Sequence, residues 1–528
     1  MTRLLVVGAV ALLVAGGLFT DRIVDDTFIS LRYARHWAEG LGPVFNVGER
    51  VEGYTNFLWT ALLAALHRLV AEESLPRAAQ LLALACGAGV VALAGRVAVR
   101  RVGPLAGGLL ALALALHSPL IAWSTAGLET SLFTLLLLGA VAIESGGAAG
   151  GLRTALPPLL LALATATRPD GIVFLPVLLG LRLLFAVEGR WRATLGGLLL
   201  FVLLYGPYWA WRWNYYGDLV PNTFYAKVGG GAAQWKRGID YVVDYVWTYG
   251  AWLPLLAAWG AWSGRGEPLL RLSAGFLAAG LFYVVSVGGE SLGFYRFMVP
   301  LVPFLALLVA TGALDLLARL RAPSARRIAT AVLLLATAWC SARPLLGTAL
   351  FPAASRKIEP RSGVAFPGDG SDHDFTWFDN YFVARQKVAA EWIAAHAPPD
   401  ALIAATPAGS IGWHLRQPLL DMLGLNNRHI AHVVIPDMGK GRAGHEKGDG
   451  RYVLSRRPRY LLLGNVAVFD HPVEEPEMET RLKFRSEREI WADPGFRRDY
   501  VRRCERVGES GPFQWFTFYE RRPEASGD

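Results

Sequence analysis

The sequence is dominated by long apolar blocks, each close to the thickness of a lipid bilayer when folded as a helix. About 20 consecutive apolar residues span the hydrocarbon core, and blocks of this length recur as far as residue 349. Only 18% of the residues are charged, whereas a soluble chain typically carries about 25%. We therefore expect a polytopic α-helical membrane protein in contact with a lipid bilayer. Eleven spans are expected, at residues 4–20, 78–96, 104–122, 130–145, 153–167, 171–187, 193–212, 245–262, 269–287, 296–318 and 328–349.

The composition changes near residue 350, where charged residues, Gly and Pro become common and apolar runs become short. This change predicts a transmembrane domain over 1–349 and a soluble α/β domain over 350–528. In the second domain, helical spacing over 384–396 ends before Pro398 and Pro399. Short apolar runs at 401–405, 418–423 and 460–463 are typical of strands.

Arginine-rich connections between the expected spans predict the orientation. If the spans are counted as above, these connections fall on one side, which the positive-inside rule makes cytoplasmic. The first loop, 21–56, and the C-terminal domain then lie on the external, periplasmic side of the inner membrane. The count requires that the apolar piece 57–70, at 14 residues, lies at the interface or re-enters rather than crossing. The arginines are Arg96, Arg100, Arg101, Arg182, Arg190, Arg192, Arg265, Arg271, Arg319, Arg321, Arg326 and Arg327.

The net charge of +9 fits cytoplasmic arginine loops, and no basic–aromatic motif typical of nucleic-acid binding accompanies it, so no nucleic-acid partner is expected. The three cysteines have no disulfide or zinc spacing. Residues 1–20 fit either a retained first helix or a signal peptide, because Arg3 precedes an apolar run with small residues near its end.

The first loop carries the most unusual polar feature, the adjacent acids Asp25 and Asp26, about five residues past the first apolar block. Placing a charged side chain beside lipid costs free energy, so such residues usually have a function. Residues 27–39 can form a helix that lies on the membrane through an apolar face and ends at Gly40. A structural alternative makes Asp25 the helix N-cap, with Asp26 stabilising the helix dipole.

Two strings of this loop, DDTFISLRYAR (25–35) and FNVGERVEGYTNFLW (45–59), resemble the terminal β-(1→2)-arabinofuranosyltransferase family. These are polyprenyl-phosphate-dependent glycosyltransferases of the GT-C class. Further similar pieces occur in order at 127–130, 167–171, 216–227, 294–300, 409–412, 421–425 and 444–447. The resemblance implies a GT-C fold. It also implies transfer of a sugar, such as the pentofuranose arabinofuranose, from a polyprenyl-phosphate donor to an acceptor polysaccharide or glycolipid at the external face.

The resemblance also implies roles for individual residues. Asp26 would be the general base for the acceptor hydroxyl, with Asp25 orienting it or binding the acceptor. Arg296, Arg168 and Lys227 are the expected donor-phosphate ligands. Arg296 is favoured because a planar guanidinium suits phosphate and this one lies at the external end of a span. There are structural alternatives. Both arginines could simply extend along the lipid so that their charged groups reach the membrane interface, and Lys227 could be an ordinary loop residue.

Eight further residues are expected to contact donor or acceptor, although Glu129 also fits a first-turn helix acid. No cofactor or metal is assigned, and a divalent cation beside Asp25 and Asp26 stays open. No glycine-rich phosphate loop follows a strand, which argues against direct use of a nucleotide sugar. The expected contacts are Glu52, Tyr54, Asn56, Glu129, Asp218, Asn222, Tyr225 and Glu290.

Other functions stay open. Protein O-mannosylation and lipid A aminoarabinose transferases share a carboxylate after the first helix, but the string VEGYTN (51–56) speaks against them. A transporter or flippase of lipid-linked sugars usually shows internal repeats, and none is visible here. A non-catalytic cell-envelope scaffold is the third alternative.

Overall fold

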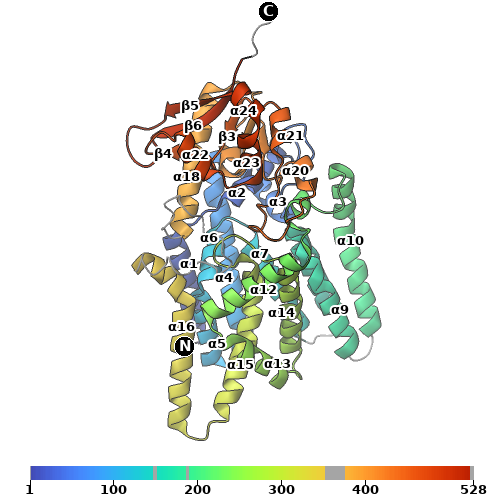
Figure 1. Cartoon of the computed structure of the whole chain (residues 1–528). Coiled ribbons are helices and arrows are strands. Elements are labelled where there is room, and N and C mark those ends of the chain that lie inside the picture. Colours follow the sequence, from blue (N-terminus) through green and yellow to red (C-terminus); the bar gives the residue numbers. More distant parts are fainter. Residues whose placement is uncertain (1, 147–151, 186–189, 351–374, 524–528) are drawn as a thin grey trace, which may run out of the picture.

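The apolar blocks form long helices that pack side by side, and a smaller α/β domain sits on one end of this bundle (Figure 1). The computed structural model describes residues 2–146, 152–185, 190–350 and 375–523. The expected domain boundary at 349/350 adjoins residues 351–374, which lie outside the described residues. The helices of the bundle and its loops are α1 (Thr2–Thr20), α2 (Asp25–Ala38), α3 (Phe57–His67), α4 (Leu75–Val102), α5 (Pro104–Ala115), α6 (Ser118–Thr125), α7 (Thr130–Glu144), α8 (Leu152–Thr167), α9 (Phe174–Phe185), α10 (Arg190–Tyr216), α11 (Asn222–Lys227), α12 (Gly231–Tyr249), α13 (Leu253–Ser263), α14 (Pro268–Ser286), α15 (Val302–Ala318) and α16 (Pro323–Leu350), with 3-10 turns η1 (Glu72–Ser74), η2 (Pro169–Val173) and η3 (Arg296–Leu301).

Within the described ranges, five helical stretches are long and apolar enough to cross a membrane: Arg3–Thr20, Glu72–Val102, Trp191–Tyr216, Pro268–Ser286 and Arg296–Ala318. The consecutive helices α5 and α6, bent by 57° at their break, make a sixth if they count as one span. Several other expected spans coincide with shorter helices, such as the 15 residues of α7, which extend only about 22 Å. These lengths do not confirm the expected count of eleven.

The expected span 245–262 is divided in the structure. Helix α12 ends at Tyr249 and α13 begins at Leu253, because Gly250 adopts φ +135°, a conformation that L side chains rarely adopt. Helix α12 also carries Lys236 and Asp240, which pair with each other on its exposed face. A single straight span at 245–262 was therefore the wrong prediction.

Helix α1 lies at the edge of the bundle and packs one face against α4, α5 and α6. Gly17 lies so close to α4 and α6 that an added Cβ would be 2.8 Å from side-chain atoms of both Leu84 and Thr125. Ala9 and Leu13 on the same helix are fully buried. The helix that precedes the aspartate pair is thus held by direct packing, and the pair starts from a fixed end.

Helix α2 is packed on more than one face, whereas the sequence predicted one apolar face; its place on the membrane surface stays a prediction. Its residues Thr27 to His36 are all buried, because α3 and α4 pack on one side and α18 and α19 of the C-terminal domain on the other. The helix ends at Ala38, and Gly40 follows with φ +82°, as the sequence predicted. Its N-cap is Val24, so the side chain of Asp25 is free to bond elsewhere.

The C-terminal domain is built on a six-stranded mixed sheet with the order β2-β1-β3-β6-β4 and β5 paired to β6. Strands β1, β2 and β3 are parallel and buried, whereas β6 runs antiparallel to β3, β4 and β5. The elements are α18 (Phe375–His396), β1 (Ile403–Ala405), α19 (Ser410–His414), β2 (Leu419–Asp421), α20 (Arg428–His432), α21 (Gly450–Ser455), β3 (Tyr460–Leu462), β4 (Ala467–Phe469), α22 (Glu475–Arg481), α23 (Arg485–Ala492), α24 (Pro494–Asp499), β5 (Tyr500–Arg506) and β6 (Trp515–Arg521). The helix ending at His396 and the first three strands were predicted from the sequence, and the last three were not.

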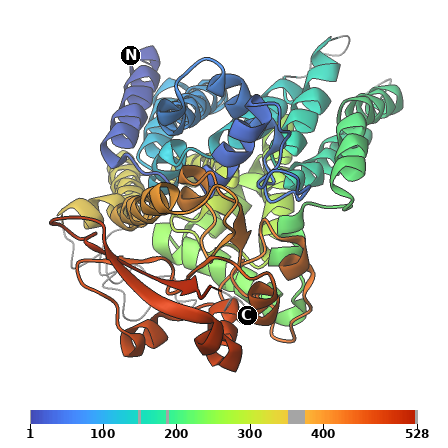
Figure 2. The same cartoon turned by 90° about the horizontal axis from the view of Figure 1, so that it is seen from above.

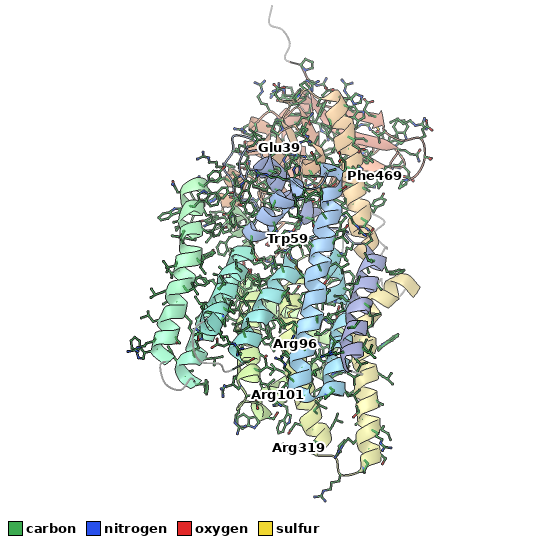
Figure 3. The ribbon with its side chains drawn as sticks, turned by 180° about the vertical axis from the view of Figure 1, so that it is seen from behind. Glu39, Trp59, Arg96, Arg101, Arg319 and Phe469 are labelled. Atoms are coloured by element: carbon green, nitrogen blue, oxygen red, sulfur yellow. The ribbon has the colours of Figure 1, made fainter. Side chains whose placement is uncertain are left out.

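Seen from above, this domain covers one side of the bundle and leaves α9 and α10 uncovered (Figure 2). Viewed from behind, Arg96, Arg101 and Arg319 lie toward the end of the bundle far from the domain, whereas Glu39 and Phe469 lie at the domain's end (Figure 3). Helix α3 has 11 residues, about 16 Å, which is too short to cross a bilayer.

Candidate active site

A cavity of about 300 Å³ opens where the bundle meets the C-terminal domain. Its floor comes from bundle loops and helix ends, and Leu425, Ala443 and Gly444 of the C-terminal domain contribute to its wall. The polar side chains that line it include Asp26, Ser30, Tyr54, Asn56, Glu129, Arg168, Asp170, Lys227, Tyr283, Glu290 and Arg296.

Asp26 is the second residue of α2 and faces this cavity with 29% of its side chain exposed. Its Oδ2 lies 4.0 Å from Arg296 Nη1, a longer contact than an ordinary hydrogen bond. Arg296 instead donates from Nε to Glu290 Oε2 at 2.5 Å. The Asp26 carboxylate thus lies beside a cation and is open to the cavity, where a bound group can reach it.

A second group of charges surrounds Arg168. Its Nη1 donates to Glu129 Oε1 at 3.0 Å, and its Nε donates to Asp170 Oδ1 at 3.0 Å. Burial works against the charge of Arg168, but Asp170 and Glu129 outweigh it and raise the pKa of the guanidinium. Burial likewise disfavours the ionised Glu129, but Arg168 and Arg296 outweigh it and lower the pKa of this carboxyl. Asn56 donates to the other Glu129 oxygen at 2.9 Å.

Phe297 contacts both guanidinium groups. The centre of its ring is 5.0 Å from the Arg168 Cζ atom and 5.5 Å from that of Arg296. Contacts of this kind orient a guanidinium over an aromatic face. The two cations therefore share one aromatic neighbour.

Lys227, the last residue of α11, differs from both arginines. It lines the cavity, yet it has no ion-pair partner among the residues that the structure describes. Its side chain lies against Gly444, where an added Cβ would come within 3.2–3.4 Å of the lysine carbons. Of the three predicted phosphate ligands, Lys227 is thus the one whose charge no described carboxylate offsets.

The structure brings eight of the predicted site residues to the cavity wall. They are Asp26, Tyr54, Asn56, Glu129, Arg168, Lys227, Glu290 and Arg296.

Five predicted site residues do not line this cavity, and each has another contact. Glu52 pairs with Arg212 at 2.6 Å, Asp218 with Arg428 at 2.9 Å, and Tyr225 stacks on His432 at 4.1 Å. Asn222 donates to the carbonyls of Gly424 and Leu425, and Asp25 accepts from the C-terminal domain. Direct contact of these five with substrate stays a prediction.

Asp170, Tyr283, Phe297 and Gly444 line the cavity but were not among the predicted residues. A signal existed for Asp170, because it lies in the string 167–171 that already pointed to Arg168. Phe297 and Gly444 likewise lie in the strings 294–300 and 444–447, whereas Tyr283 lies inside an apolar block, where no local pattern places it near Asp26.

The carboxylates of Asp25 and Asp26 contact different groups. Asp25 bonds to three N–H donors of the C-terminal domain, whereas Asp26 turns into the cavity beside Arg296. Within the described ranges, no three His, Cys, Asp or Glu side chains gather as a metal-binding group. A cation near Asp25 and Asp26 stays a prediction, and no reaction step is drawn through it.

The fold is that of ArnT from Cupriavidus metallidurans. The structure of that protein bound to undecaprenyl phosphate aligns with a TM-score of 0.58 at 14% identity, covering 98% of this chain and 97% of ArnT. Its apo structure aligns with a TM-score of 0.53 at 16% identity, over 81% of this chain and 89% of the other. Together with the apolar helices, this makes the chain a multi-pass membrane protein of the GT-C fold.

In sequence, the chain is similar to two proteins named terminal β-(1→2)-arabinofuranosyltransferase. It is 32% identical to the one from Corynebacterium glutamicum over 324 residues, and 32% identical to the one from Mycobacterium tuberculosis over 285 residues. The matches cover 53% and 47% of this chain, and they span less than half of each relative, 46% and 42%. Residues 379–519 match a family model described as Domain of unknown function (DUF8728).

Proposed function

We propose that this protein is a membrane glycosyltransferase that moves a sugar from a polyprenyl-phosphate donor to an acceptor glycan. The observation that carries the proposal is the cavity itself, in which the exposed Asp26 carboxylate faces a group of three cations. The cavity lies between an apolar bundle and a polar domain, where a lipid phosphate and a water-soluble acceptor can meet. The fold of ArnT and the similarity to arabinofuranosyltransferases support this assignment.

In the proposed reaction, the acceptor hydroxyl oxygen forms a bond to the anomeric carbon of the donor sugar. The bond from that carbon to the phosphate oxygen breaks, and the polyprenyl phosphate leaves with the electron pair. Asp26 takes the hydroxyl proton as general base. Lys227 and the guanidinium groups of Arg296 and Arg168 stabilise the charge that grows on the leaving phosphate.

The other cavity residues would hold the sugar and the acceptor. Tyr54 and Asn56 offer hydroxyl and amide groups on one wall, and Glu129 and Glu290 offer carboxylates that are already oriented by arginine. We propose a pentofuranose such as arabinofuranose as the transferred sugar, because the two relatives at 32% identity are named arabinofuranosyltransferases.

We also propose that the cavity and the C-terminal domain face the periplasm. The arginine-rich connections support this orientation, since Arg96, Arg101 and Arg319 lie toward the opposite end of the bundle (Figure 3). Positive residues flanking spans favour the cytoplasmic side. Eleven spans place the first loop and the last domain on the same side, whereas the five or six long helices alone leave the number open.

The test is a transfer assay on the purified full chain with polyprenyl-phosphate sugars of different ring form, pentofuranose against hexopyranose. Asp26→Asn should abolish transfer while donor-lipid binding persists, because the amide cannot accept the proton. Asp21→Asn, which changes an exposed carboxylate of the same loop paired with Arg77, is the matched control and should transfer normally. Transfer by Asp26→Asn at the wild-type rate would remove the assigned base.

The transporter and scaffold alternatives make different predictions in the same preparation. A flippase would move a labelled polyprenyl-phosphate sugar across a vesicle membrane without transferring it to any acceptor. A scaffold would do neither. Transfer by the wild-type chain excludes both as the complete function.

A further inference from the structure

The first-loop helix α2 holds the short helix α19 of the C-terminal domain at both of its ends. At the start of α19, Asp25 accepts from Ser410 N at 2.7 Å and from Gly409 N at 3.2 Å. Gln386 of α18 links the two, since it donates to Asp25 at 2.8 Å and accepts from Ile411 N at 3.1 Å. The free N–H groups at this helix start are thereby satisfied by one carboxylate and one amide.

At the end of α19, two arginines of α2 satisfy the free carbonyls. Arg35 donates to Trp413 O at 2.6 Å and to Leu415 O at 3.2 Å. Arg32 donates to Gly412 O and, further on, to Gln417 O at 3.0 Å. Both arginine side chains are buried. An acid at the start of a helix and cations at its end also match the helix dipole.

The contact at Asp25 is tight as well as hydrogen-bonded. An added Cβ at Gly409 would lie 2.0 Å from Asp25 O and 2.5 Å from its carboxyl carbon, so this position has no room for a side chain. Asn380 of α18 joins the same region, since it donates to Asp21 O and accepts from Ile23 N, both at 3.0 Å. The start of α2 is therefore held from two sides: by these contacts with the C-terminal domain, and by the bundle, where Thr27 donates to Ala126 O at 2.6 Å.

We propose that the C-terminal domain completes the active site, and that Asp25 is the positioning residue that holds Asp26 through α19. Asp26 follows Asp25 directly on the first turn of α2, so any movement of one moves the other. The same domain supplies Leu425, Ala443 and Gly444 to the cavity wall. A shift of this domain against the bundle would therefore change the shape of the site. The inference rests on the proposed function, because it assigns Asp26 the role of base.

Steady-state transfer by the purified full chain tests the proposal, with kcat and the donor KM measured separately. Asp25→Ala and Gly409→Ala should each lower kcat roughly 10²-fold through a displaced base and leave the donor KM near the wild-type value. The double variant Asp25→Ala with Gly409→Ala should have a kcat no lower than that of the slower single variant, because both substitutions disrupt the same contact. Asp25→Asn retains an acceptor for Ser410 N. Its kcat should fall by less than about tenfold, which corresponds to the loss of one hydrogen bond.

The controls separate positioning from chemistry and from misfolding. Arg503→Ala, which removes an exposed ion pair with Glu520 between β5 and β6, should transfer at the wild-type rate. If Gly409→Ala does not fold, Gln386→Met takes its place, since it removes the linking amide without adding a side chain at Gly409.

Two results would overturn the proposal. One is a wild-type kcat for Gly409→Ala or its substitute. The other is an Asp25→Asn variant as inactive as Asp26→Asn, which would show that the charge of Asp25 acts on the substrate. Hydrogen exchange of α2 amides keeps the two proposals distinguishable. The exchange rate should rise in Asp25→Ala. If this rise is seen but the wild-type chain transfers no sugar, the transferase assignment is wrong, whereas the role of Asp25 in holding α2 against α19 is retained.

Discussion

Replacing Arg168 by methionine removes the cation that lies between two buried carboxylates. The side chains of Arg168, Glu129 and Asp170 are only 8%, 3% and 10% exposed, and the guanidinium bonds to both acids at 3.0 Å. Methionine has a similar length and no charge. The substitution therefore leaves two acids that have lost their common partner.

The expected loss follows from this geometry. Breaking a buried ion pair costs about 3–5 kcal/mol, because the remaining charge stays desolvated. Asn56 continues to donate to Glu129, which limits the loss on that side, while Asp170 loses its bonds to Arg168 at 3.0 and 3.3 Å. We expect Arg168→Met to lower the free energy of unfolding by about 3–5 kcal/mol.

Denaturant unfolding in detergent, followed by the fluorescence of the 18 tryptophans, measures this loss. Neutralising the acids as well, in Arg168→Met with Glu129→Gln and Asp170→Asn, should return most of the stability. Arg319→Met is the control, because Arg319 is 62% exposed in its pair with Asp315 and should cost less than about 1 kcal/mol. The reasoning is refuted if Arg168→Met costs no more than this control, or if the triple variant is no more stable than the single one.

Three further outcomes are expected. Burial raises the pKa of Asp25 from 3.8 to about 6, so the folded chain holds a proton that the unfolded chain releases between these values. Stability should therefore fall as pH rises from about 4 to about 6, and denaturant midpoints measured across that range should lose this slope in Asp25→Asn. Lys227→Met should raise the donor KM at least tenfold with a smaller change in kcat, since a charge-assisted phosphate contact contributes about 1.5–3 kcal/mol; an unchanged donor KM would exclude Lys227 as a phosphate ligand. Glu52→Leu should destabilise the protein by about 3–5 kcal/mol because it leaves the buried Arg212 without its carboxylate partner. A changed acceptor KM at normal stability would instead show that Glu52 contacts substrate.

The sequence predicted the membrane class and much of the site because those depend on local patterns. Apolar blocks predict helices directly, and residues that follow one another across external loops end on one side of a bundle. Asp26, Arg168, Lys227 and Arg296 could therefore be expected near one another although 270 positions separate the first from the last. Their meeting in one cavity is what the structure adds.

The remaining parts depended on contacts that no local pattern encodes. Glu52 was expected to bind substrate because it lies in the first loop, but its partner Arg212 lies 160 positions away on α10. Helix α2 has the apolar spacing of a surface helix, and its other face is buried only because α18 and α19 pack against it. Charged residues in a loop can bind a ligand or another part of the chain, and sequence alone does not separate the two.

The bond between Asp25 and Ser410 also sets an order of events during synthesis, since its partners are 385 positions apart. Helices of the bundle pack through neighbours and can form as the chain emerges, whereas this contact waits for the last domain to be made and folded. Until then the start of α2 has no partner for its first carboxylate, and the cavity has no wall at Gly444. In a newly inserted chain, the first loop therefore lacks these contacts until the C-terminal domain docks. A defect in docking would displace Asp26, because Asp26 directly follows Asp25.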